Sequence, residues 1–189
     1  MAEMAAQAAL PTDEALLNVL EQSVSEVFSM MVCSFEAAAV YRRDLSGDRV
    51  GESGGVHLVL QGRRDDSVHI DREAVVEFRG ALEGRVVLRC SADGALDIAR
   101  GMLMLQGDAM LAIEEVNDAL KECANMLTGS LKTKPLDPPG DFKVSIPFIN
   151  DAHRDPIGPS CGALVYRLQK GLVSLEIWRR EKPLEAPAA

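Results

Sequence analysis

The residues best suited to chemistry recur at helical spacing in the second half of the chain: Asp118, Glu122, Asn125 and Gly129. On a helical wheel they fall within about 60° of one another. A carboxamide can donate to and accept from one water at once, so Asn125 could hold a water in line with a phosphorus atom. A carboxylate beside it can pair with a lysine of a partner. Gly129 costs about 1 kcal/mol against alanine within a helix, which favours a site that another surface approaches closely.

A solvated helix face is the alternative interpretation of the same residues, because acidic and amide side chains are common on exposed helices. Glu114 and Asn117 form a second Glu-x-x-Asn pair in the same stretch. Asn117 lies about 80° farther round the wheel than Asn125, toward the border of the apolar arc. The wheel therefore predicts that Glu122 and Asn125 are the exposed pair. From the residues alone, both interpretations stay open.

Two long amphipathic helices are expected to position these residues. The second begins at Gly107-Asp108, runs to about Leu131, and has an apolar stripe at Ile113, Val116, Leu120, Cys123 and Leu127. The first runs from Asp13 to about Phe35, and a shift of 96 residues places its stripe on the second: Leu17, Leu20, Val24, Val27 and Met31. Each stripe covers an arc of roughly 80° and so predicts one buried face.

Two β-hairpins are predicted by period-2 apolar runs at 74–91, with a turn that includes Gly84, and at 161–180, turning near Lys170-Gly171. They match at a shift of 87 residues. Further strands are expected near 38–44, 56–62 and 142–149, and Ser91 can cap a helix that runs to 105. The fold class is therefore α+β: a pseudo-twofold helix-plus-hairpin repeat, with a largely antiparallel sheet packed by two long helices. One domain is expected over 13–180, with flexible extensions at 1–12 and 181–189.

Composition argues against several classes of function. The chain of 189 residues has a net charge of −9 and scattered basic residues, which disfavours nucleic acid. No apolar run reaches the roughly 20 residues that span a bilayer, and no secretory signal is evident, so we expect a cytoplasmic protein without a membrane. The four cysteines form no C-x-x-C pair and are expected to be buried apolar residues. His69 and Asp71 could share a strand face, but without a third ligand no metal site is predicted.

Residues 118–129, DALKECANMLTG, resemble the signature of the CheC/CheX/FliY chemotaxis phosphatases, and NMLTG is especially similar to CheX. The first helix, VLEQSVSEVFSMM, and the stretch VVEFRGALEGRVVLRCSADGALDIARGML also resemble CheX. The likeness covers about residues 14–180. In the first helix, Ser29 stands at the position equivalent to Asn125, so the chain resembles the CheX-like members with one active face rather than CheC-like members with two. The charged segments 44–54 and 62–72 are longer than the family pattern.

The resemblance implies a two-component signalling hydrolase, a protein phosphatase that removes the aspartyl phosphate of a CheY-like response regulator. Asn125 would then orient the attacking water and Glu122 would bind the active-site lysine of the regulator, while Asp118 and Gly129 would contact the partner. The regulator would supply the phosphoaspartate and Mg²⁺, and this chain would bind no cofactor. A homodimer formed through the sheet is also implied. The alternative is a non-catalytic CheX-like module that binds a response regulator or a flagellar switch component.

Overall fold

The structure is a computed structural model that describes residues 12–31, 57–59, 67–80, 82–132, 142–150 and 160–180. Its helices are α1 (Asp13–Met31), α2 (Ala92–Met102) and α3 (Ile113–Lys132). Its strands are β1 (His57–Val59), β2 (Ser67–His69), β3 (Arg72–Arg79), β4 (Glu83–Cys90), β5 (Lys143–Val144), β6 (Phe148–Ile149), β7 (Ser160–Arg167) and β8 (Leu172–Arg180). The strand expected near 38–44, the segment 44–54 and the extensions 1–11 and 181–189 lie outside the described residues.

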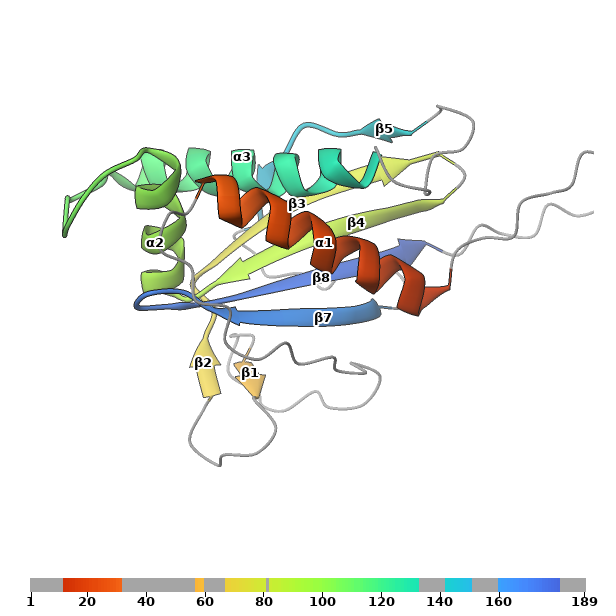
Figure 1. Cartoon of the computed structure of the whole chain (residues 1–189), viewed down its shortest axis with the longest axis horizontal. Helices are drawn as coiled ribbons and strands as arrows, with labels where there is room; N and C mark the ends of the chain where they lie inside the picture. The colour runs from red at the N-terminus through yellow and green to blue at the C-terminus, as the bar shows by residue number, and fades with distance from the viewer. Residues whose placement is uncertain are drawn as a thin grey trace, which may run out of the picture.

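The main sheet has the strand order β5-β3-β4-β8-β7, with β6 also paired to β3, and every pairing is antiparallel. Figure 1 shows α1 and α3 lying side by side across one face of this open sheet. β1 and β2 pair separately as a two-stranded sheet. The expected class, mixed helix with an antiparallel sheet, is confirmed.

The two hairpins meet along β4 and β8, and their register carries the repeat. Leu88 lies opposite Leu175, which is the residue onto which the 87-residue shift moves it. The shift moves Val86 onto Val173 and Cys90 onto Ile177. In the sheet these partners are crossed, because Val86 faces Ile177 and Cys90 faces Val173, as a twofold axis between Leu88 and Leu175 requires. In addition, α3 packs over β3 and α1 over β7, the outer strand of each hairpin. Sheet register and helix placement therefore agree with a pseudo-twofold relation between the hairpins.

The helix-covered face of the sheet holds the main core. The predicted stripes of α1 and α3 are buried at Leu17, Leu20, Val24, Val27, Val116, Leu120, Cys123 and Leu127. Ile113 is an exception, because 45% of it is exposed. It is the first residue of α3, and it lines an open hollow beside α2 rather than the sheet. Cys90, Cys123 and Cys161 are buried, as expected.

Both helix boundaries around residues 103–112 differ from the prediction. α2 begins after its expected cap, where the Ser91 side chain accepts from the Gly94 N–H, but it ends at Met102 rather than 105. α3 begins at Ile113 rather than at 107. Met104 and Gly107 have φ of 53° and 70°, which interrupts a right-handed helix. The Glu115 carboxylate accepts from the Ala112 N–H at 2.7 Å and fixes the new helix start.

β3 ends at Arg79 and β4 already begins at Glu83, so the predicted turn at Gly84 was wrong. Gly84 lies within β4 opposite Phe78, and a Cβ there would collide with the Trp178 carbonyl oxygen and the Phe78 ring. The expected strand at 142–149 is instead two short strands, β5 and β6. Between them the Ser145 hydroxyl, rather than a backbone carbonyl, accepts from the Glu77 N–H at 2.9 Å. The segment 62–72, expected as a loop, contains β2.

The second hairpin turns between Arg167 and Leu172, as predicted near Lys170-Gly171, and this turn packs against α2. The Asp97 carboxylate accepts from the backbone N–H groups of Lys170 and Gly171, at 2.7 and 3.0 Å. A Cβ on Gly171 would overlap the backbone of Gly94. This contact fixes α2, and through it the start of the loop that leads into α3.

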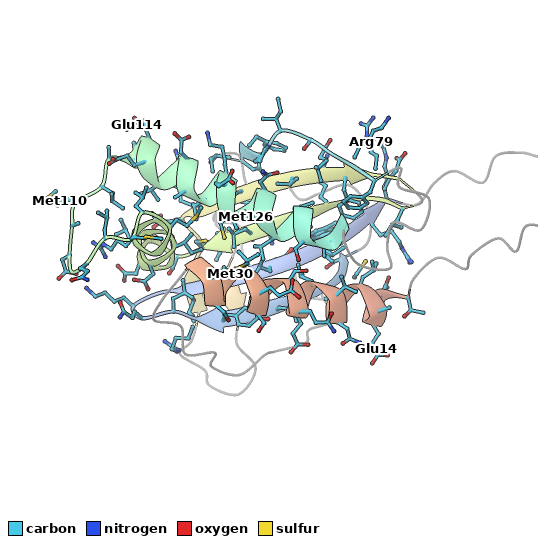
Figure 2. The ribbon with its side chains drawn as sticks, turned by 45° about the horizontal axis from the view of Figure 1, so that its top comes forward. Glu14, Met30, Arg79, Met110, Glu114 and Met126 are labelled. Atoms are coloured by element: carbon cyan, nitrogen blue, oxygen red, sulfur yellow. The ribbon has the colours of Figure 1, made fainter. Side chains whose placement is uncertain are left out.

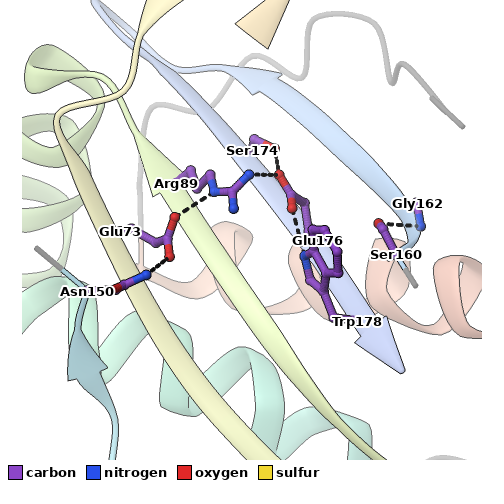
Figure 3. Close-up of polar contacts among 8 residues, drawn as sticks. All are labelled: Glu73, Arg89, Asn150, Ser160, Gly162, Ser174, Glu176 and Trp178. Carbon is purple, nitrogen blue, oxygen red and sulfur yellow. Dashed lines mark hydrogen bonds and ion pairs between the residues drawn. The ribbon is translucent and has the colours of Figure 1, made fainter. Parts of the chain in front are cut away.

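A buried charged cluster lies on the other face of the sheet, away from α1 and α3 (Figure 3). The Arg89 guanidinium on β4 donates to Glu73 on β3 at 2.7 Å and to Glu176 on β8 at 2.8 Å. Asn150 donates to the second oxygen of Glu73, and the Trp178 indole N–H to the second oxygen of Glu176. The cluster therefore joins three neighbouring strands and ties the segment that carries β6 to β3.

Candidate functional site

The four candidate residues lie on the part of α3 that faces away from the sheet. Val116, Leu120 and Leu127 point into the core, so the opposite side of the helix faces outward, which Figure 2 turns toward the viewer. Asp118 and Glu122 are exposed, and Asn125 and Gly129 are partly exposed. The structure therefore brings the predicted residues together along one accessible line, in the order in which the helix presents them.

The side chains of Glu122 and Asn125 are not engaged by any other described residue. Within the described ranges, neither side chain makes a hydrogen bond or an ion pair. Asp118 differs, because its carboxylate lies 2.6 Å from the ammonium of Lys121. That pair is exposed, with 74% of the Asp118 side chain accessible, and pairs of this kind contribute little stability. A carboxylate and a carboxamide thus stand one helical turn apart, free to contact water and a partner.

Gly129 leaves open space on the same face. Apart from its chain neighbours and the nearby backbone of its own helix, an ideal Cβ at this position meets no atom of the described residues within 4 Å. Packing inside the protein therefore does not require a glycine here, in contrast to Gly84 and Gly171. Because Gly129 is partly exposed and has no side chain, another molecule could approach the backbone of α3 closely there.

α1 lies along one flank of this face without repeating it. The Glu26 carboxylate accepts from the Ser130 hydroxyl at 3.2 Å and links the two helices. Glu26 is the counterpart of Glu122 under the 96-residue shift, and the counterpart of Asn125 is the exposed Ser29. The carboxylate and carboxamide pair is therefore present on α3, while α1 carries a hydroxyl where the carboxamide would be.

The competing pair on α3 has a different environment. Glu114 is exposed, but Asn117 is partly buried, and its Oδ1 is enclosed without a hydrogen-bond partner among the described residues. Asn125 is partly exposed as well, so the two asparagines differ in the enclosed Oδ1 of Asn117 rather than in overall exposure. Of these two carboxamides, Asn125 is the one on the outward line with Glu122.

The electrostatics of the site favour binding and positioning over covalent chemistry by this chain. Cys123 lies directly behind Glu122, and burial, together with the Glu122 charge, raises the pKa of its thiol to about 12. A protonated, enclosed thiol is a poor nucleophile. Among the described residues, no group of three or more His, Cys, Asp or Glu side chains is arranged to hold a metal ion. What this face offers is a carboxylate for a cation and a carboxamide for a water.

One feature near the site was missed by the sequence prediction. Met104 and Met110 lie in the α2–α3 connection and are 85% and 98% exposed. The run MLMLQGDAML was interpreted as the end of one helix and the start of the next. Its central Gly107 was the available signal for a connection, since a glycine there suits a left-handed backbone.

The comparisons with known proteins agree with the resemblance in the sequence. The family model of the chemotaxis phosphatase CheX matches residues 73–154. The structure of a CheX from Desulfovibrio desulfuricans superposes with a TM-score of 0.60 at 17% identity, covering 87% of this chain and 99% of that one. The CheX-CheY-BeF3-Mg²⁺ complex from Borrelia burgdorferi gives 0.62 at 15% identity, with 87% and 97% covered. FliY from Thermotoga maritima gives 0.55 at 14% identity, with 92% of each chain covered. No curated protein matches the sequence significantly.

Proposed function

We propose that this chain, a CheX-like member of the CheC/CheX/FliY chemotaxis phosphatase family, hydrolyses the aspartyl phosphate of a CheY-like response regulator. The observation that carries the proposal is the outward line on α3, where Glu122 is exposed, Asn125 is partly exposed, and neither side chain is bonded to another described residue. The family match covers this helix, so the two residues belong to the part of the chain that is CheX-like in sequence.

Asn125 is the proposed catalytic residue. Its carboxamide oxygen accepts a hydrogen bond from a water, and its NH₂ group can donate to the phosphoryl oxygens or to the same water. The water oxygen attacks phosphorus while the bond from phosphorus to the aspartyl oxygen breaks. The products are inorganic phosphate and the free aspartate, and the water proton leaves with the phosphate. Because the transition state is loose, correct placement of the water is the main contribution the protein has to make.

Glu122 is the proposed docking residue at the same site. Its carboxylate, one turn before Asn125, would pair with the lysine that lies beside the phosphoaspartate of the regulator. This pairing fixes the distance between the regulator and the carboxamide of Asn125. Asp118 extends the acidic line, and Gly129 leaves room for the regulator backbone. Mg²⁺ would come with the regulator rather than with this chain.

The other expectations remain predictions at this stage. They are a cytoplasmic location, a homodimer formed through the sheet, and no contact with nucleic acid. In the described ranges, no helix has the length and apolar character needed to cross a bilayer.

The experiment is decay of a ³²P-labelled response regulator from the same organism in Mg²⁺, with wild-type protein, Asn125→Ala and Asn117→Ala. Asn117→Ala is the matched control, since it removes a carboxamide from the same helix but not from the outward line. We expect faster decay with wild type and with Asn117→Ala, and decay at the unassisted rate with Asn125→Ala. If wild-type protein binds the regulator without accelerating decay, the chain is instead a non-catalytic binding module.

A further inference from the structure

The connection between α2 and α3 displays apolar side chains to solvent at the end of the candidate site. Met104 and Met110 are 85% and 98% exposed, and three more residues around them are 39–46% exposed. We call this set the apolar loop: Leu103, Met104, Leu105, Met110 and Ile113. Figure 2 shows Met110 at the outer end of the connection, beyond the start of α3. Apolar residues clustered on a surface in this way mark interaction sites.

Hydrogen bonds hold the apolar loop in its extended position. The Arg100 guanidinium donates to the Ala109 carbonyl from Nε and Nη2, at 3.3 and 3.2 Å. The Leu105 N–H donates to the Arg100 carbonyl at 2.9 Å. Lys170, from the β7–β8 turn, forms an ion pair with Asp108. The loop is therefore anchored at both ends and in its middle, so its methionines are presented in a fixed arrangement.

The backbone conformation of Met104 also supports an interaction site. Its φ of 53° is in the left-handed region, which residues with a side chain seldom adopt and which is unfavourable for them. Glycine or asparagine would relieve this strain. Strained residues of this kind cluster at binding and active sites. The left-handed turn itself ends α2, because the Met104 and Leu105 N–H groups donate to the Gly101 and Arg100 carbonyls. That cap does not require a long apolar side chain held in water, which is what Met104 adds.

A hollow of about 210 Å³ adjoins the loop, between α2, the start of β3 and the first turn of α3. Leu96, Leu111 and Ile113 form part of its apolar lining, and Asp71 and Arg72 lie at it as well. An apolar side chain of a partner could enter this hollow while the methionines cover its surroundings. The protruding methionines and the hollow together give this region a shape that fits a protein surface.

We infer that the apolar loop is the docking surface for the receiver domain of the response regulator. The inference rests on the proposed function and adds to it the surface that provides affinity. Ile113 begins the helix that carries Asn125, and at 1.5 Å per residue the two lie about 18 Å apart along it, within the reach of one small domain. The regulator patch that fits is apolar with a basic rim, because the first turn of α3 carries Glu114 and Glu115.

The same charges disfavour a second copy of this chain as the occupant. In a symmetric contact each patch meets its own copy. The acidic first turns of two α3 helices would then face each other across the interface, which is unfavourable. A partner with lysine or arginine around an apolar patch satisfies both the methionines and the acidic turn.

The test compares Met104→Gln/Met110→Gln with Met110→Leu in the full chain, using a cognate receiver domain labelled at its aspartate. Glutamine keeps the length of methionine but is polar, and leucine keeps the apolar character. We expect the double variant to raise the half-saturating regulator concentration about tenfold or more, with an unchanged maximal decay rate. Met110→Leu should stay within about twofold of wild type. Circular dichroism and light scattering of each variant report on folding and self-association.

An unchanged half-saturating concentration in the double variant overturns the inference and leaves the phosphatase proposal standing. A double variant that only loses self-association also overturns it, because the surface would then bind a second copy. If wild-type protein accelerates no decay, the proposed function itself fails and the inference fails with it. The variants of the apolar loop and the Asn125 variant therefore separate the two claims.

Discussion

Arg89 on β4 and Glu176 on β8 form a buried ion pair, with 2.8 Å between Nη1 and Oε1, on the sheet face turned away from α1 and α3. Glu73 on β3 lies 2.7 Å from the same guanidinium. The side chains of all three are at most 5% exposed. The single charge of one arginine is therefore shared between two carboxylates that have little access to water, and the sheet that supports α3 depends on this arrangement.

Replacing Arg89 should destabilise the fold strongly. Arg89→Ala leaves Glu73 and Glu176 buried without their cation, and breaking a buried pair in this way costs about 3–5 kcal/mol. Arg85→Ala is the matched control, because its pair with Glu77 joins β3 and β4, two of the three strands of the cluster, but is about one-third exposed. We expect about 1 kcal/mol or less there. Urea unfolding of both variants at neutral pH measures the difference, and equal losses would contradict this account.

Glu176 should make stability depend on pH. Burial raises its pKa above the ordinary 4.5, although the Arg89 charge opposes the shift. A raised pKa means that its favourable contribution is complete below pH 4.5 and is lost as pH rises through the native value. The unfolding free energy of Glu176→Gln minus that of wild type should therefore become more positive as pH increases from 4.5 toward neutrality. Glu77→Gln controls for the loss of a charge on the same face. A difference that falls with pH would refute the prediction.

The same substitution should have opposite effects at two glycines. Gly129→Ala fills open space on a helix and should stabilise the protein by about 0.5–1 kcal/mol. Gly171→Ala drives a Cβ into the backbone of Gly94 and should cost about 1–3 kcal/mol. Thermal unfolding compares them directly. If Gly129 serves docking, its alanine variant should also bind the regulator less tightly despite its higher stability. Gain of both stability and affinity would argue against that role.

Glu122→Gln should weaken regulator binding while leaving the maximal rate largely intact. Removing a carboxylate that pairs with a lysine should raise the half-saturating concentration about tenfold. The affinity of wild type should also fall more steeply with added salt than that of the variant. Glu14→Gln removes an exposed charge at the far end of α1 (Figure 2) and serves as the control. Identical salt dependence of Glu122→Gln and wild type would exclude the proposed contact.

The repeat was predictable because each half satisfies the same physical requirement. Apolar periodicity located both hairpins and the buried stripes, and the 87-residue offset reappears in the pairing of Leu88 with Leu175. Helix periodicity also places Asn125 on the line of Glu122 and Gly129 and Asn117 off it, since the angle around a helix depends on sequence spacing alone.

What the sequence did not predict depends on contacts between distant segments. The α2–α3 connection is apolar enough to continue a helix, and its actual course is held by Lys170 from another hairpin. Gly84 was predicted as a turn residue, but it is required because Trp178 and Phe78 approach it. The Arg89 cluster was not predicted either, because alternating strand residues give no sign that an outer sheet face is buried.

The most direct measurement of the central claim is the decay rate of the labelled regulator at saturating protein, with affinity measured in parallel for the regulator activated by beryllium fluoride and Mg²⁺. Asn125→Ala should bind the activated regulator within about threefold of wild type, because the affinity is assigned to Glu122 and the apolar loop. Its saturated rate should fall at least about 100-fold, or to the unassisted rate, because the water is no longer positioned. A saturated rate equal to that of wild type would contradict the account.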